Sequence, residues 1–225
     1  MELLVVTLAR TAPSREADGL AQIRLVNDTV RYAPGLVTLR AYRSREAETY
    51  YLTLTTWEDE EAWQKAQERY NPKQLLVAGA SDLLLIPPKQ WLMHYLWGYS
   101  RPATQTVLAA AHVASIRPDQ TEYARRGWVE SLRREVVQPT LASAFLARGL
   151  DEETLSNTTA SEKAPSDAIN RVPTASYLQG PIFLNLLNWP DQANEEEFYT
   201  DPDYQAINRF LTSVGIVQVL AIEPL

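Results

Sequence analysis

The chain carries an internal duplication, and this feature constrains its fold more than any single motif does. In the first half, the apolar segment YYLTLTTW runs into the acidic stretch EDEEAW, with Trp57 at the junction. In the second half, PIFLNLLNW runs into PDQANEEEF, and Trp189 takes the corresponding place. The halves also match at VTLARTAPS and AHVASIRPD near their starts, and at LLLIPP and VLAIEPL near their ends. Repeated supersecondary units bury a shared core, so we predict two domains, residues 1–100 and 101–225.

Composition excludes several classes of function. The net charge of −7 and the pI of about 5.0 argue against nucleic-acid binding, which needs a basic surface. The absence of cysteine excludes disulfides, thiolate catalysis and cysteine-based metal sites. The first ten residues lack the basic region of a signal peptide. The apolar segment WLMHYLWGY falls well short of the ~20 residues that span a membrane. We expect a soluble cytoplasmic protein with neither nucleic acid nor membrane as a partner.

Hydrophobic periodicity predicts the order of elements in the first half. Alternating apolar residues indicate strands, apolar residues spaced three and four apart indicate helices, and Asn71-Pro72 marks a break. The resulting order, β-α-β-β-α-β, is that of a ferredoxin-like unit. The expected strands are residues 2–10, 36–43, 50–57 and 82–87. A further strand at 90–99 follows the complete unit, and we expect it to reach across to the sheet of the other half.

The second half repeats this order with an insertion. A strand at 106–116 leads into a helix near 119–137. The offset between the halves grows from 105 residues at Pro13 and Pro118 to 132 at the two tryptophans. The extra residues lie around 150–173, a polar stretch poor in large apolar side chains. We predict a surface loop there, either a tolerated insertion or a lid over a cleft.

Strand alternation separates two rows of side chains in each half. Leu52 and Leu54 share one face of their strand, and Ile182, Leu184 and Leu186 share one face of theirs. We expect these aliphatic rows to lie beneath the helices. The mixed polar and aromatic rows would then face each other and enclose a barrel-like interior. The expected lining is Arg40, Tyr42, Tyr51, Thr53, Thr55, Phe183 and Asn185. Trp91, Met93, Tyr95, Trp97 and Tyr99 form a further row, either an interdomain contact or an aromatic pocket for a flat ligand.

The segment LTLTTWEDEEAW resembles the antibiotic biosynthesis monooxygenase domain of the dimeric α+β barrel superfamily. The resemblance covers most of residues 1–100 and, more weakly, 105–225. Members of that family usually have one unit per chain and pair two chains through their open sheet faces. The resemblance therefore implies an α+β protein in which two ferredoxin-like units pack sheet to sheet as an intramolecular barrel. Such a chain would be a monomer with an internal pseudo-dimer, or a higher homo-oligomer.

The resemblance implies several activities. Some members oxidise polycyclic aromatic polyketides with molecular oxygen and no cofactor, and others handle signalling molecules or quinones. Heme-degrading members use an Asn on the first strand, a Trp after the third strand and a His on the second helix. The Trp corresponds to Trp57 and, by the repeat, to Trp189. The Asn position falls near Thr7 and His112, and the second-helix stretches 60–76 and 190–213 contain no histidine. This departure disfavours heme degradation, and we expect no cofactor.

The leading hypothesis is a cofactor-independent monooxygenase that acts on a small aromatic or quinone-like substrate in the barrel interior. His112 would accept a phenolic proton, and Arg40 would stabilise the phenolate or enolate. The residues expected to bind the substrate are Tyr42, Tyr51, Trp57, Tyr95, Asn185 and Trp189. Each of these also has a structural explanation, as core or as an interdomain hydrogen-bond network. The alternatives are a non-catalytic barrel that binds heme or another flat hydrophobic molecule, and a barrel filled by its own side chains. No metal-ligand spacing is present.

Overall fold

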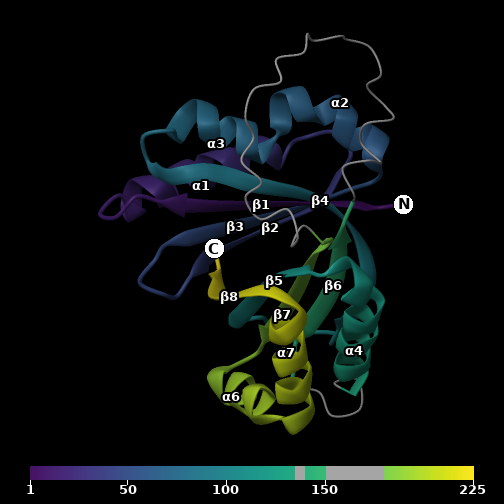
Figure 1. Ribbon diagram of the computed structural model, residues 1–225. Helices are drawn as coiled ribbons and strands as arrows, with labels where there is room; N and C mark the ends of the chain where they lie inside the picture. The colour runs from purple at the N-terminus through teal and green to yellow at the C-terminus, as the bar shows by residue number, and fades with distance from the viewer. Residues whose placement is uncertain (135–139, 151–179) are drawn as a thin grey trace, which may run out of the picture.

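The computed structural model describes residues 1–134, 140–150 and 180–225, which form one closed barrel with helices on two opposite sides (Figure 1). The predicted α+β barrel is therefore confirmed, and it closes within a single chain. None of the helices in these residues is long and apolar enough to cross a membrane. The insertion expected around 150–173 lies outside the described residues apart from Leu150, so its role stays a prediction, as do the boundary at residue 100 and any association of chains.

The two units repeat the same order of elements. The first contains β1 (Leu3–Thr11), α1 (Glu16–Val30), β2 (Leu36–Ser44), β3 (Tyr50–Trp57), α2 (Glu60–Tyr70), α3 (Pro72–Ala80) and β4 (Leu84–Ser100). The second contains β5 (Leu108–Ile116), the short 3₁₀ helix η1 (Pro118–Gln120), α4 (Thr121–Arg134), β6 (Ser143–Gly149), β7 (Ile182–Trp189), α6 (Gln192–Thr200), α7 (Pro202–Val214) and β8 (Gly215–Pro224).

The helices after the third strand of each unit begin with equivalent caps. Asp59 accepts a hydrogen bond from the backbone N–H of Ala62 at the start of α2. Asp191 does the same for the N–H of Asn194 at the start of α6. Asn71 and Asp201 cap α3 and α7, and in each case a proline occupies the first turn. These caps satisfy backbone donors that lack an intrahelical partner, so the acidic run after each tryptophan has a structural cause.

The strand order around the barrel is β1-β3-β2-β8-β5-β7-β6-β4, and all neighbouring strands are antiparallel. The long β4 joins the units, because its first half pairs with β1 and its second half with β6. The prediction that the strand at 90–99 reaches across to the sheet of the other unit is confirmed. The prediction of two separate strands at 82–87 and 90–99 is wrong. Pro87 and Pro88 lie at a register shift between the β1 and β4 ladders, where a bulge lets a strand accommodate proline.

The second seam between the units is much shorter. β2 and β8 pair only at Tyr42–Pro224, Arg43–Glu223 and Ser44–Ile222, and the N–H of Leu225 adds a bond to the carbonyl of Ala41 at 3.0 Å. Among the described strands, none pairs with residues 36–40 of β2 on this side. The barrel wall is therefore open beside the first half of β2.

Three apolar clusters make up the core. The barrel interior is filled by aliphatic residues from both units, among them Leu4, Val6, Leu52, Leu54, Leu184, Leu186 and Leu220. A second cluster lies between the first unit's strands and its helices, and includes Tyr51, Trp57 and Trp63. A third lies under the second unit's helices, and includes Trp128, Phe183, Trp189 and Tyr204.

These clusters confirm the two rows of β3 and β7 but reverse the faces that we predicted for them. The single row predicted from Trp91 to Tyr99 is wrong, because a register shift between Tyr95 and Trp97 leaves Trp91 and Met93 facing the interior and Trp97 facing the helices of the second unit. The aliphatic rows point into the barrel, and Tyr51, Trp57, Phe183 and Trp189 lie on the helix side. By the same alternation, Thr53, Thr55 and Asn185 also lie on the helix side. The prediction was wrong because a closed barrel covered by helices buries both faces of its sheet, so apolar content does not distinguish them. Tyr42 does face the interior, as expected.

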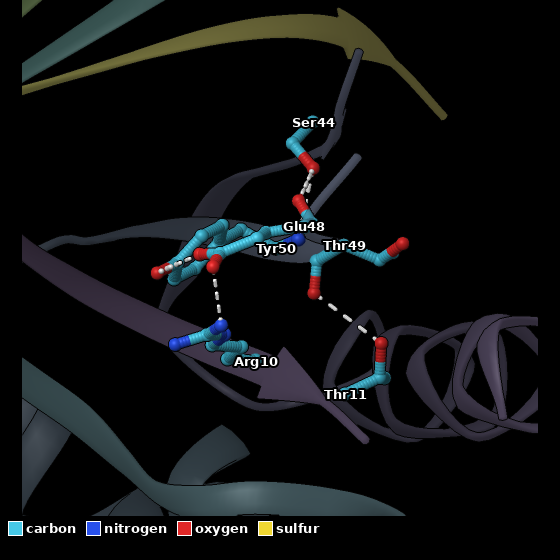
Figure 2. Close-up of polar contacts among 6 residues, drawn as sticks. All are labelled: Arg10, Thr11, Ser44, Glu48, Thr49 and Tyr50. Atoms are coloured by element: carbon cyan, nitrogen blue, oxygen red, sulfur yellow. Dashed lines mark hydrogen bonds and ion pairs between the residues drawn. The ribbon is translucent and has the colours of Figure 1, made fainter. Parts of the chain in front are cut away.

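The turn between β2 and β3 is held by polar contacts (Figure 2). Ser44 donates its hydroxyl to the carbonyl of Glu48 at 2.6 Å and accepts from the N–H of Tyr50 at 2.9 Å. The Glu48 carboxylate pairs with Arg10 at 2.6 Å, and the Arg10 guanidinium lies 5.5 Å from the centre of the Tyr50 ring. These contacts tie the hairpin to β1. They hold β2 in register with β3 and so position the β2 side chains at the other end of the barrel.

Candidate functional site

A groove of about 1270 Å³ opens at one end of the barrel. Its lining comes from strand ends of both units, including Thr56 of β3, Ser100 of β4, Ser143 of β6 and Asn188 of β7. The groove also follows residues 37–42 of β2, where the wall is open, and reaches α1. It is therefore a mouth of the barrel that extends sideways through the short seam.

Two tyrosines from different strands place their hydroxyl groups in this groove. Tyr42 on β2 donates to Oδ1 of Asn188 at 3.4 Å, and the hydroxyls of Tyr95 on β4 and Thr56 lie 2.9 Å apart. Thr56 and Asn188 each precede the tryptophan that ends its strand. Thr56 and Asn188 are therefore equivalent positions of the two repeats, and each forms a hydrogen bond with one of the two tyrosine hydroxyls. We call Arg40, Tyr42, Thr56, Tyr95 and Asn188 the phenol corner.

Burial keeps both phenols of this corner protonated. It raises the pKa of Tyr42, and the nearby Arg40 guanidinium offsets only part of that rise. The pKa of Tyr95 is also raised by burial, with partial offsets from its hydrogen bond to Thr56 and from the charge of Arg40. Arg40 itself is exposed and has no carboxylate within ion-pair distance in the part of the chain that the structure describes. A cation beside two neutral hydroxyl groups is suited to an anionic oxygen such as a phenolate.

Aromatic side chains form the walls. Tyr95 and Phe145 meet edge to face with ring centroids 5.2 Å apart. Trp97 and Tyr99 border the groove as well, but they stack on each other at 6.4 Å on the helix side of β4, where Trp97 packs against the cluster beneath the second unit's helices. The wall formed by Tyr95 and Phe145 favours a flat apolar ligand, because aromatic rings pack well in offset and edge-on arrangements.

The structure brings together only part of the predicted site. Arg40, Tyr42 and Tyr95 all line the groove. Tyr51 lies beneath the helices of the first unit and donates its hydroxyl to the carbonyl of Glu16 at 3.0 Å. Trp57 packs against Trp63 in the same layer, with ring centroids 5.2 Å apart. The predicted residues therefore divide between the barrel mouth and the helix side of the wall.

His112 lies on the helix side of the second unit, so the expectation that it faces the interior is wrong. It is buried opposite Asn185 in the ladder between β5 and β7, and its Nε2 is 3.4 Å from the hydroxyl of Tyr204 on α7. Burial lowers the pKa of His112 to about 4, which makes the ring neutral at pH 7. Burial likewise raises the pKa of Tyr204. His112 and Arg40 do not share one site.

Two buried polar atoms of β7 have no hydrogen-bond partner within the described ranges. They are Oδ1 of Asn185 and the indole Nε1 of Trp189. Trp189 otherwise packs against Phe198 and Tyr199, with ring centroids 5.5 Å away in both cases. Both predicted residues thus belong to the packed layer beneath α6 and α7.

Sequence reasoning missed Thr56, Phe145 and Asn188. A signal existed for Asn188, because it is a polar residue at the end of the aliphatic row that begins at Ile182. It also missed four residues of α1 that line the groove, Arg24, Asn27, Asp28 and Arg31. Those positions are spaced as one helix stripe, but nothing in the sequence places this stripe beside the open part of β2.

The groove does not fit heme ligation by histidine, because neither His94 nor His112 lines it. Tyrosine can also bind heme iron, but the phenols of Tyr42 and Tyr95 are hydrogen-bonded to Asn188 and Thr56 and are kept neutral by burial. In the described ranges, no three His, Asp or Glu side chains gather into a potential metal site.

Comparison with known proteins shows one family that part of the chain matches and several solved structures with a similar fold. Residues 3–70 match the antibiotic biosynthesis monooxygenase family. A search of curated protein sequences found no match. An anthrone oxidase-like protein of known structure superposes with a TM-score of 0.70 at 12% identity, over 100% of this chain and 91% of the other.

Two bacterial proteins, each proposed to be a monooxygenase, have similar structures. The one from Fusobacterium nucleatum gives a TM-score of 0.69 at 10% identity, over 100% of this chain and 92% of its own. The one from Lactobacillus acidophilus gives a TM-score of 0.62 at 6% identity, over 99% of this chain and 93% of its own. At these identities the likeness demonstrates the fold alone. Residues 3–70 of this chain are therefore similar to the antibiotic biosynthesis monooxygenase family, and over its whole described length the chain has the fold of these three proteins.

Proposed function

We propose that this protein is a cofactor-independent monooxygenase whose small aromatic or quinone-like substrate binds in the phenol corner. The observation that carries the proposal is that Arg40, which has no carboxylate partner among the described residues, lies beside two neutral phenol groups in an aromatic-walled groove. The family match of residues 3–70 and the monooxygenase-like names of the structural neighbours support the same class of reaction.

The corner would act by stabilising an anionic form of the substrate. A phenol bound beside Arg40 loses its proton more readily, because the guanidinium stabilises the phenolate. The hydroxyls of Tyr42 and Tyr95 would add to this by turning from Asn188 and Thr56 to donate to the bound phenolate. The proton passes to water, since the groove is open and no side chain of the corner is a strong base. An electron-rich phenolate donates an electron to oxygen directly. In the net reaction a substrate CH₂ group becomes a carbonyl, and the second oxygen atom leaves as water with the two hydrogens.

Oxygen consumption with 1,8-dihydroxyanthrone tests the proposal, after subtraction of the spontaneous oxidation rate. Arg40→Ala should lower kcat/KM by about 10²-fold, the typical effect of removing one group that stabilises a developing anion. Tyr42→Phe should lower it less, because Tyr95 and Arg40 remain. Arg125→Ala, which changes a partly exposed arginine on α4, is the control and should keep the wild-type rate. An unchanged rate in Arg40→Ala, together with a lost rate in His112→Gln, would refute the proposal and place the reaction beneath α7.

One observation favours a second candidate, a non-catalytic barrel that binds a flat hydrophobic molecule. None of the five side chains of the phenol corner is a general base at neutral pH, and His112 lies on the other side of the barrel wall. In that case 1,8-dihydroxyanthraquinone should bind and quench tryptophan fluorescence, and Arg40→Ala should weaken its binding. The wild-type protein would then consume no oxygen above background with the anthrone.

A further inference from the structure

The groove is larger than a flat aromatic ring system requires. Pockets for drug-sized ligands have volumes of about 300–1,000 Å³, whereas this groove measures about 1270 Å³. The phenol corner occupies the barrel mouth, and the groove continues past the open half of β2 to α1. A ligand confined to the corner therefore leaves the α1 side of the groove empty.

That side is lined by a polar stripe of α1. Arg24, Asn27, Asp28 and Arg31 stand at positions i, i+3, i+4 and i+7, which share one face of a helix. We call these four residues the α1 stripe. It contrasts with the aromatic walls of the mouth, so the groove has two chemically different ends.

The α1 stripe offers donors and acceptors together. Arg31 pairs with Asp28 at 3.6 Å, and Arg24 has no carboxylate within ion-pair distance among the described residues. Asn27 is 6% exposed, and its Oδ1 has no hydrogen-bond partner there. A buried acceptor left unpaired costs about 1–3 kcal/mol. Asn27 lines the groove, so a donor on a bound ligand would remove that cost after a rotation of the carboxamide.

The mixture of donors and acceptors in the α1 stripe determines which polar group of a ligand can bind there. A carboxylate or phosphate supplies only acceptors, so it would leave Oδ1 of Asn27 unpaired and would face the negative charge of Asp28. An ammonium group would satisfy these two residues but would lie beside the two guanidinium groups of the stripe. Hydroxyl groups both donate and accept, and several of them on one ring can serve all four side chains.

We infer that the ligand is a glycoside, with its flat aromatic ring in the phenol corner and its sugar along the α1 stripe. The inference rests on the proposed function for the position of the ring, and it adds the sugar. Linking two weakly bound parts in one molecule raises affinity, because the second part binds without a further loss of translational freedom.

Calorimetric titration of the full chain tests this with four coumarin probes. They are 6,7-dihydroxycoumarin, its 6-O-β-D-glucoside and 6-O-β-D-galactoside, which keep the 7-hydroxyl group free for the phenol corner, and 6,7-dihydroxycoumarin-4-acetic acid as an anionic analogue. At least one glycoside should bind about tenfold more tightly than the aglycone, equivalent to about 1.4 kcal/mol. Arg24→Ala and Asn27→Leu should return the glycoside to the aglycone's Kd and leave the Kd of the aglycone unchanged. Thr29→Val, elsewhere on α1, is the control and should change neither value.

The outcomes separate this inference from the proposed function. If the aglycone binds and Arg40→Ala weakens it, but neither glycoside binds more tightly, the sugar site is refuted and the aromatic site stands. If the anionic coumarin binds most tightly, and Arg24→Ala removes that gain, the stripe is an anion site and the inference is wrong. If the aglycone shows no binding, the aromatic site fails. Because Arg24 is exposed, Arg24→Ala tests the stripe even if Asn27→Leu fails to fold.

Discussion

Trp57 donates its indole N–H to Oγ1 of Thr55 at 3.0 Å, within the buried layer between β3 and the helices of the first unit. The equivalent Trp189 has no such partner, because Leu187 occupies the position that corresponds to Thr55. Both indoles are fully buried. The repeats thus share the packing role of the tryptophan, but among the described residues only Trp57 has a hydrogen-bond partner for its indole N–H.

This difference predicts that Thr55→Val is destabilising although it nearly preserves volume. The change leaves the Trp57 donor unpaired in the core, and the free energy of unfolding should fall by about 1–3 kcal/mol. Urea denaturation followed by tryptophan fluorescence measures the change. Thr53→Val, on the same buried face two residues earlier, is the matched control and should cost clearly less. Equal losses at the two positions would show that the Trp57 hydrogen bond contributes nothing.

The buried His112 predicts a specific dependence of stability on pH. Its pKa is about 4 in the folded protein, against 6.5 for the unperturbed group, so the unfolded chain binds the proton more readily. Stability should therefore be full above pH 6.5 and decrease as the pH falls toward 4, by about 3 kcal/mol in total. Unfolding free energies of wild type and His112→Gln across this range should converge as the pH falls. Parallel curves would contradict the burial of a neutral histidine.

Gly35 should tolerate substitution poorly. Its φ of +78° lies in the left-handed region, and an added Cβ would approach the Cβ of Ala62 to 2.6 Å. Gly35→Ala should lower stability by about 1–3 kcal/mol, the usual cost of such a backbone conformation for a non-glycine residue. Gly98→Ala is the control, because its added Cβ would meet nothing closer than 3.9 Å. Thermal unfolding should show a lower Tm for Gly35→Ala and almost none of that loss for Gly98→Ala.

The ion pair between Arg45 and Glu195 joins the two units, since Arg45 follows β2 and Glu195 lies on α6. The Glu195 side chain is only 11% exposed. Arg45→Ala leaves this carboxylate without its cation and should cost about 1–3 kcal/mol, less than for a fully buried pair. Arg125→Ala breaks an exposed pair with Glu122 and should cost about 0–1 kcal/mol. Chemical denaturation of both variants checks the ranking, and a larger loss in Arg125→Ala would contradict it.

Local patterns were sufficient for much of the fold. The matched landmarks around Trp57 and Trp189 predicted two ferredoxin-like units, and alternation predicted the composition of the rows of β3 and β7. The aromatic residues at 91–99 predicted a strand that bridges the units, and β4 does so. Pro87 and Pro88 suggested a break that does not occur, because a bulge against β1 accommodates them. A bulge depends on the partner strand, so the residues of one strand alone do not reveal it.

The candidate site was predicted only in part, for a related reason. Arg40, Tyr42 and Tyr95 were expected at a shared interior, and they meet in the groove. The partners of the two phenols, Thr56 and Asn188, come from strands of different units. The α1 stripe lines the groove only because the seam between β2 and β8 is short. Contacts of this kind depend on how the barrel closes.

The sequence by itself determined the duplication, the order of the elements and the two side-chain rows of β3 and β7, because these follow from local spacing and backbone geometry. Only the tertiary structure decided which row faces the barrel interior, that His112 lies beneath α7 while Arg40 lies at the mouth, and that one seam is open. The physical reason is that a helix-covered closed barrel buries both faces of its sheet. Alternation then divides the residues of β3 and β7 correctly but does not orient them, and it fails in β4, where a register shift between Tyr95 and Trp97 splits the predicted row. Orientation and register shifts both follow from hydrogen bonding between strands far apart in the chain.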